Sequence, residues 1–354
     1  MPDEINPSGE LSPKDNSYLI GHEDAERLFL RTWQNNSMHN SWLISGIEGI
    51  GKATLAYRFA RFLLSADNTR KDSYTSLDVS PAFPVFKLVS NNSHPDLKII
   101  ERDYTDTDKK KILKAIKDGE QLSSGEMKEL KKSAFIRVDD VRTINEFLSK
   151  RSSNDGWRIV IIDSIDDMNV ASANAVLKIL EEPPHKTLLL LISHNPNQLL
   201  PTIKSRCAKI ELKPLSDANV ASLLRRYRPE LSEMAVKKIT AISSGSIGKA
   251  LNYVDNDAVN RYDALCRIIE RKSSFAVADV LDFCNEASAN EESYYLTQEL
   301  ILKFLSENVK NTTHIVELAD CWDNAVKVFS EVERLNLDKK QALINIIVNI
   351  CKHI

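Results

Sequence analysis

The chain has 354 residues, a formal net charge of −3, 42% apolar residues and 27% charged residues. These values are ordinary for globular proteins of two or three domains, and the slight acidity excludes a general nucleic-acid coat protein. No apolar run reaches the roughly 20 residues that a membrane span requires. We therefore expect a cytoplasmic protein without membrane association, whose polar, proline-containing residues 1–18 form a flexible leader.

Apolar segments of strand length alternate with helical segments between residues 41 and 212. The expected strands are 41–45, 96–100, 158–163, 187–193 and 208–212, and the expected helices include 53–64, 141–150 and 171–182. Such alternation is typical of a parallel sheet with helices on both faces. The sequence therefore predicts an α/β domain over residues 19–212.

A glycine-rich loop, "GIEGIGK", follows the first expected strand. Its candidate nucleotide-binding residues are Gly46, Gly49, Gly51 and Lys52. Glycines let backbone N–H groups turn toward a phosphate, and the lysine reaches the terminal phosphates. The next residue should carry a hydroxyl for Mg²⁺, but it is Ala53, and Thr54 comes one position late. Because one residue is a rotation of about 100° around a helix, Thr54 is a poor replacement.

A carboxylate ends the strand "RIVIID". Asp163 could hold Mg²⁺ through water, as in phosphate-transferring enzymes of this kind. In such enzymes a glutamate usually follows and polarises the attacking water, whereas here Ser164 follows, and a hydroxyl is too weak a base. The loop and Asp163 therefore favour binding of ATP with Mg²⁺ over its hydrolysis.

Arg206 lies in "SRC", directly before the strand 208–212. A guanidinium at this place either pairs with a carboxylate of its own chain or reaches across an interface to the phosphates of a neighbouring subunit. Spacing alone leaves both interpretations open.

The C-terminal part of the chain lacks helix breakers. All ten glycines and twelve prolines lie at or before Gly248, so the last 106 residues contain neither. This composition predicts an all-helical domain over 257–354, preceded by a small helical lid over 213–256. Residues 101–133 are rich in lysine with interspersed acids, which favours a solvated helical insertion over a DNA-binding patch.

Several stretches together resemble the delta-prime family of AAA+ subunits from the clamp loader of bacterial DNA polymerase III. The matching stretches occur in the family's order: "LIGHE" at 19–23, "GIEGIGKATLA" at 46–56, "HPD" at 94–96, "VDDVR" at 138–142, "RIVIID" at 158–163, "NAVLKILEEPP" at 174–184, "SRC" at 205–207 and "GSIGKAL" at 245–251. The resemblance implies an AAA+ P-loop domain, a helical lid and a C-terminal collar that mediates oligomerisation.

The resemblance also implies a function. The chain would be the largely non-hydrolysing stator of an ATP-driven machine that loads the sliding clamp onto primed DNA. Its partners would be gamma/tau-type motor subunits and the delta subunit, and Arg206 would act in trans on a neighbouring ATPase subunit.

The departures from the family pattern are consistent with this role. Ala53 and Ser164 replace the metal-binding hydroxyl and the hydrolytic glutamate, and Gly248 stands where active relatives carry a sensor arginine. Residues 66–93 contain none of the cysteines of the family's zinc module, so we expect no zinc, and the fold of this segment is left open.

Two other functions remain under consideration. A catalytically active AAA+ motor subunit would keep Lys52 and Asp163 in use, and steady-state ATP turnover would identify it. A DNA-binding protein acting without partners would use the lysines of 101–133, and a salt-dependent DNA affinity would identify it.

Overall fold

The computed structural model describes residues 12–118, 130–152, 156–271, 277–309 and 315–353. The chain divides into two compact units, Met1–Asn219 and Val220–Ile354. The second unit holds most of the predicted lid and all of the predicted collar, so the boundary between those two stays a prediction.

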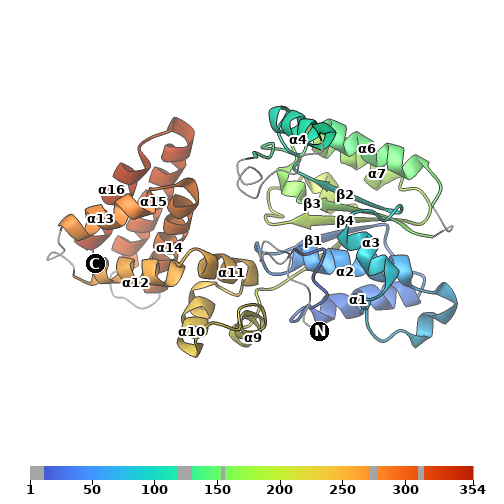
Figure 1. Ribbon diagram of the computed structural model, residues 1–354, viewed down its shortest axis with the longest axis horizontal. Coiled ribbons are helices and arrows are strands. Elements are labelled where there is room, and N and C mark those ends of the chain that lie inside the picture. The colour runs from blue at the N-terminus through green and yellow to red at the C-terminus, as the bar shows by residue number, and fades with distance from the viewer. Residues whose placement is uncertain (1–11, 119–129, 153–155, 272–276, 310–314, 354) are drawn as a thin grey trace. The chain divides into compact units, whose positions relative to one another are not determined.

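A five-stranded parallel sheet forms the centre of the first unit (Figure 1). Its strands are β1 (Ser41–Ser45), β2 (Leu97–Glu101), β3 (Arg158–Asp163), β4 (Thr187–Ser193) and β5 (Ala208–Glu211). They lie in the order β2-β3-β4-β1-β5, so the five predicted strands are confirmed. Since Ser45 pairs with Ser193, and Asp163 with Ile192, the carboxyl ends of β1, β4 and β3 lie side by side.

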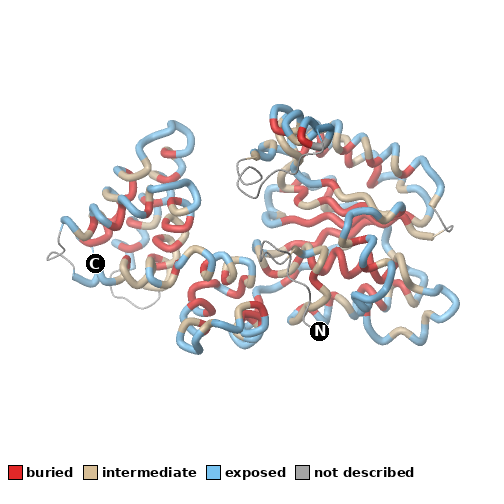
Figure 2. Tube along the Cα trace, viewed as in Figure 1, coloured by how far each residue is buried: buried red, intermediate tan, exposed pale blue. Residues whose placement is uncertain are grey.

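Helices cover both faces of this sheet, because alternate strand residues point to opposite sides. In β1, Trp42 and Ile44 pack against α1 (Glu23–Gln34), α2 (Lys52–Ser65) and α3 (Pro84–Ser90), while Leu43 packs on the other face. That second face is covered by α6 (Val138–Ser149), α7 (Val170–Glu181) and the short α8 (Pro201–Lys204). Figure 2 shows the resulting buried strands, which explains why the strands are apolar without alternation.

Residues 66–93 fold without a metal-binding cysteine. They form the 3-10 helix η1 (Asn68–Ser73) and α3, and Leu77 between them is fully buried in the core beneath α2. Tyr74 packs edge-on against Trp33 and Phe62 at ring-centroid distances of 5.4 and 5.3 Å. Aromatic and aliphatic packing therefore anchors this segment.

Part of the expected leader packs on α2. Arg61 is 2% exposed, and its guanidinium donates hydrogen bonds to the carbonyl oxygens of Lys14 (2.8 Å) and Asn16 (2.7 Å). Residues 12–18 are therefore held against the domain, and residues 1–11 lie outside the described residues.

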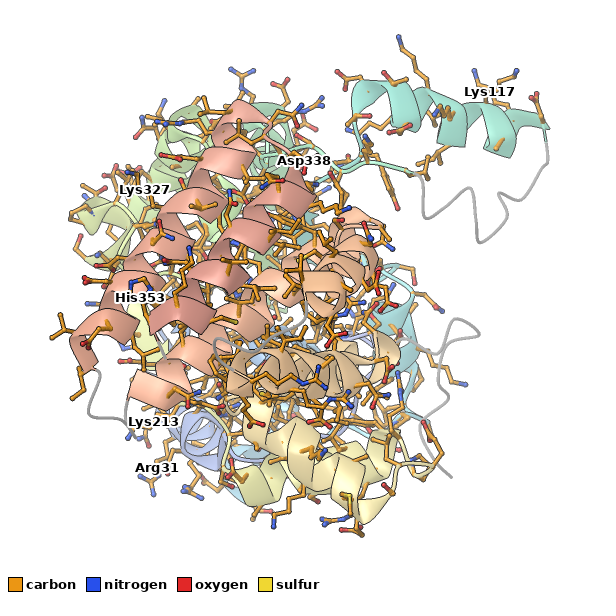
Figure 3. The ribbon with its side chains drawn as sticks, turned by 90° about the vertical axis from the view of Figure 1, so that its left-hand side faces the viewer. Arg31, Lys117, Lys213, Lys327, Asp338 and His353 are labelled. Atoms are coloured by element: carbon orange, nitrogen blue, oxygen red, sulfur yellow. The ribbon has the colours of Figure 1, made fainter. Side chains whose placement is uncertain are left out.

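The lysine-rich insertion contains α4 (Asp106–Asp118), the helix at the upper right of Figure 3 that carries the label Lys117 near its far end. The predicted helix is confirmed over these residues, and 119–129 lie outside the described part. A short 3-10 helix, η2 (Ile165–Asp167), follows β3.

Helices are the only regular secondary structure in the described part of the second unit, and over the residues after Gly248 the absence of breakers predicts this. They are α10 (Glu233–Ile242), α11 (Ile247–Asp255), α12 (Ala258–Glu270), α13 (Val277–Ala287), α14 (Glu291–Val309), α15 (Ile315–Leu335) and α16 (Lys339–His353), preceded by α9 (Asp217–Tyr227), which begins in the first unit. Helices α12 to α16 share one apolar core, and in Figure 3 α15 and α16 lie side by side, with Asp338 at the turn between them. No helix of the described residues has both the length and the apolar character of a membrane span.

Candidate functional site

The glycine loop after β1 has a backbone that requires glycine. Gly46, Gly49 and Gly51 have φ angles of +147°, +75° and +103°, which side-chain-bearing residues rarely adopt. A Cβ atom on Gly46 would lie 2.6 Å from the carbonyl oxygen of Leu212. The loop is therefore shaped as a phosphate-binding turn, and α2 begins at its end with Lys52.

Lys52 is held inside this loop. Its side-chain ammonium donates hydrogen bonds to the carbonyl oxygens of Gly46 (2.8 Å) and Ile47 (2.6 Å), and the residue is 3% exposed. Burial lowers the pKa of Lys52 to about 8, and the charge of Asp163 opposes that shift. An incoming phosphate would have to replace these two carbonyl contacts.

The carboxyl ends of β3 and β4 supply the polar side chains opposite the loop. Burial raises the pKa of Asp163, although the charges of His194 and Lys52 oppose it. Asp166 accepts hydrogen bonds from the Ser193 hydroxyl (2.9 Å) and from the backbone N–H of His194 (2.5 Å). Asp166 therefore joins η2 to the end of β4, while Asp163 faces the lysine as the candidate for a water-mediated metal contact.

The hydroxyl groups near the loop do not supply a water-activating base. Ser164 is 3% exposed, and its Oγ contacts no hydrogen-bonding partner among the described residues. Thr54 is buried in α2, and Ala53 packs against the core of the same face. Positions 53 and 164 thus hold an apolar side chain and a buried hydroxyl, which provide neither a metal ligand nor a base.

His22 contacts the loop and was not singled out from the sequence. Its Nε2–H donates to the carbonyl oxygen of Ile50 over 2.7 Å, and burial lowers the pKa of the ring. Leu19 lies beside Gly51, where an added Cβ would meet it at 3.1 Å. The stretch "LIGHE" therefore closes one side of the loop, a role that only its place in the motif could have suggested.

Arg206 pairs with a carboxylate of its own chain. One guanidinium nitrogen lies 2.9 Å from Glu181 of α7, and another donates to the carbonyl oxygen of Thr202 over 3.0 Å. The side chains of Arg206 and Glu181 are 35% and 50% exposed, so the pair lies at the surface. The pairing that the sequence left open is thus present, and it leaves the guanidinium accessible.

Arg206 and the glycine loop lie at opposite edges of the sheet. Arg206 precedes β5, whereas Gly46 follows β1, and the two strands run parallel. The N–H of Leu212, which follows β5, donates to the carbonyl oxygen of Ser45 (2.8 Å), so Gly46 lies beside the carboxyl end of β5. The four residues of β5 place its amino end, near Arg206, roughly 13 Å from its carboxyl end, near the glycine loop, at about 3.3 Å per residue. Arg206 therefore does not serve the loop of its own chain.

Residue types that bind metals are dispersed through the part of the chain that the structure describes. Within those residues, no group of three or more His, Cys, Asp or Glu side chains is placed to hold a metal ion. The five cysteines are free thiols. Gly248, where the resemblance would place a sensor arginine, is an exposed residue of α11 in the second unit.

Comparison with known sequences gives a consistent set of matches. Residues 21–216 match the family described as "DNA polymerase III, delta subunit". The DNA polymerase III subunit delta' of Pseudomonas aeruginosa is 34% identical over 209 residues, which cover 58% of this chain and 53% of that protein. The Escherichia coli subunit delta' is 27% identical over 246 residues, covering 70% and 63%. The matched segments thus span between half and two thirds of these relatives.

One solved structure is similar over nearly the whole chain. It is a DNA polymerase III gamma subunit-related protein from Thermotoga maritima, with 18% sequence identity and a TM-score of 0.49. The alignment covers 92% of this chain and 99% of that one.

Proposed function

The chain belongs to the DNA polymerase III delta-subunit family, and from this membership we propose that it is a delta-prime-type subunit of a cytoplasmic clamp loader. In this role it would help to place the sliding clamp on primed DNA. Its partners would be gamma/tau-type motor subunits and the delta subunit, and contacts with clamp and DNA would arise in the assembled complex.

The observation that carries this proposal is a glycine loop that has its glycines and its lysine but lacks a metal-binding hydroxyl and a water-activating base. The loop glycines have positive φ angles and Lys52 lies inside the loop, whereas Ala53 offers no metal-binding hydroxyl and the buried Ser164 hydroxyl has no hydrogen-bonding partner among the described residues. Such a loop supports binding of ATP with Mg²⁺ and no activation of water. Asp163 would be the residue that contacts the metal through water, and we propose no zinc site.

The position of Arg206 supports a contribution to catalysis in trans. The guanidinium is surface-exposed, lies at the sheet edge opposite its own loop, and is positioned by Glu181. A planar, permanently charged group presented in this way suits the phosphates of a nucleotide bound to a neighbouring subunit.

The test combines assembly with turnover. The purified chain alone should hydrolyse ATP negligibly, whereas adding it to motor and delta subunits from the same cell should restore clamp loading on primed DNA. Robust ATP turnover by the isolated chain would favour the motor-subunit alternative, and DNA affinity without partners would favour the independent DNA-binding protein.

Assembly is proposed to reside in residues 257–354, which contain the core shared by α12 to α16. The predicted lid also packs within the second unit, because Lys238 of α10 pairs with Asp263 of α12 over 2.6 Å. A chain shortened to residues 1–216, ending before α9, is therefore the cleaner test. It should keep the sheet domain folded but fail to join the complex on size-exclusion chromatography, and normal incorporation would contradict the assignment.

A further inference from the structure

A cavity of about 420 Å³ lies at the amino edge of the sheet, the edge opposite the glycine loop. Its wall includes Asn40 before β1, Trp157 before β3, and His185 and Lys186 before β4, together with Lys71 of η1. We call this cavity the amino-edge pocket. Its volume lies in the range of small-molecule sites, roughly 300–1,000 Å³.

The lining of the amino-edge pocket combines hydrogen-bonding amides, positive charge and one flat aromatic ring. The described lining residues comprise three asparagines, two lysines, one histidine and one tryptophan, and none of them is a carboxylate. Lysine ammonium groups attract phosphate, and asparagine amides both donate and accept, as the edge of a nucleobase requires. Trp157 is half-buried against the apolar core and also lines the pocket, and an indole is a group on which a base can stack.

Backbone hydrogen bonds tie the strand-entry segments of this pocket together. The carbonyl oxygen of Asn40 accepts from Leu189 N–H (2.7 Å), and that of Lys186 accepts from Arg158 N–H (2.8 Å). Lys186 itself has a φ of +53°, an uncommon backbone conformation for lysine. The wall is thus attached directly to the sheet.

Lys71 is also fixed at the pocket. Its ammonium donates to the Trp33 carbonyl oxygen (3.1 Å) and to the Asn36 side-chain oxygen (2.6 Å), and it lies 4.9 Å from the centre of the Trp33 ring. Asn36, with a φ of +55°, lines the same cavity. These contacts keep one positive charge at the pocket before any ligand arrives, which reduces the entropy lost on binding.

We propose that the amino-edge pocket binds a nucleotide unit, either free or as part of a single strand. The base stacks on Trp157, the asparagine amides bond its edge, and the phosphate lies between Lys71 and Lys186. Inorganic phosphate would leave the indole unused, and an apolar ligand would make no use of the lysine charges or the amides. The inference goes beyond the proposed function, because it does not involve the glycine loop or Arg206.

The experiment uses the full chain carrying Lys52→Ala, so that the glycine loop does not contribute to binding. AMP and, separately, pentathymidylate are titrated by calorimetry, and binding should saturate below about 1 mM. Stacking on an aromatic residue is worth about 1–3 kcal/mol per base, a factor of roughly 5 to 150 in affinity. Trp157→Leu, which keeps an apolar side chain, should therefore weaken binding at least fivefold.

Two further variants separate a binding role from a folding role. Lys186→Asn supplies a residue that tolerates positive φ, and it should weaken the binding of both ligands without altering thermal melting. Lys87→Gln, an exposed lysine of α3 outside the pocket, is the matched control and should bind as the parent does.

Comparison of the two ligands identifies the source of the nucleotide. Equal affinities for AMP and pentathymidylate indicate a free nucleotide, and tenfold tighter binding of the oligonucleotide indicates a single strand. Absence of saturable binding, or pocket variants that all bind like Lys87→Gln, would overturn the proposal.

Discussion

Arg206→Ala tests whether Arg206 has a role beyond its own ion pair, and the structure limits what the pair itself can contribute. Arg206 and Glu181 are 35% and 50% exposed, and pairs exposed to this degree contribute about 0.2–1 kcal/mol. For a chain of this size, 1 kcal/mol corresponds to a shift in melting temperature of roughly 2–4 °C or less. The isolated variant should therefore remain folded.

The effect on catalysis is expected to be far larger than this stability change. An arginine supplied in trans accelerates phosphate transfer at one ATP site on the order of 10³–10⁵-fold. The total ATPase rate of a ring-shaped complex falls less when one such arginine is lost, because the other ATP sites keep their arginines. We expect Arg206→Ala to assemble normally and to lower the clamp- and DNA-stimulated ATPase of the reconstituted complex. Arg206→Lys should restore little, because an ammonium lacks the planar fork of guanidinium.

Two matched variants make the assay decisive. Glu181→Gln removes the charge of the partner while leaving the arginine, so it should cost similar stability and retain most of the activity. Arg142→Ala, which breaks the exposed pair with Asp139 (2.8 Å) on α6, should leave both quantities unchanged. Wild-type loading by Arg206→Ala would refute the reasoning, and equal losses of activity in Arg206→Ala and Glu181→Gln would assign Arg206 to the ion pair.

Three further predictions concern the loop and its support. Gly46→Ala should destabilise the chain by roughly 3 kcal/mol in urea unfolding, because the new Cβ meets Leu212 at 2.6 Å and φ is +147°; wild-type stability would contradict the geometry. ATP affinity should fall as pH rises through about 8, because a bound phosphate raises the pKa of Lys52 and binding above that pH takes up a proton. Calorimetry in buffers of different ionisation enthalpy measures this proton uptake, and Lys52→Ala should abolish it. Arg58→Met should lower the free energy of unfolding by roughly 2–3 kcal/mol in the same assay, since Arg58 is buried and pairs with the mostly buried Glu26. The exposed Arg27→Met should change it by no more than about 0.5 kcal/mol, and equal effects of the two variants would refute the burial argument.

Local sequence was sufficient to predict the five strands and the helical character of the C-terminal part. Strands covered on both faces must be apolar throughout, so segments such as 187–193 were recognisable without any knowledge of their neighbours. A turn that needs positive φ favours glycine, which made the loop at Gly46 visible, and helices joined by short turns make up the described residues of the breaker-free C-terminal part. Each of these features depends on residues close together in the chain.

The order of the strands and the contacts of the site were decided by tertiary structure. No local pattern places β4 between β1 and β3, yet that order brings Asp163 and Ser193 to the edge where the loop lies. The bond from His22 to Ile50 joins residues 28 positions apart.

Arg206 shows the same division between sequence and structure. Sequence identified the residue and left its partner open, because a guanidinium can pair with any carboxylate that folding brings near. The fold brought Glu181 to it and placed the pair at the edge away from the loop. The amino-edge pocket likewise has no sequence signature, since its walls come from four separate segments of the chain that only the parallel sheet aligns.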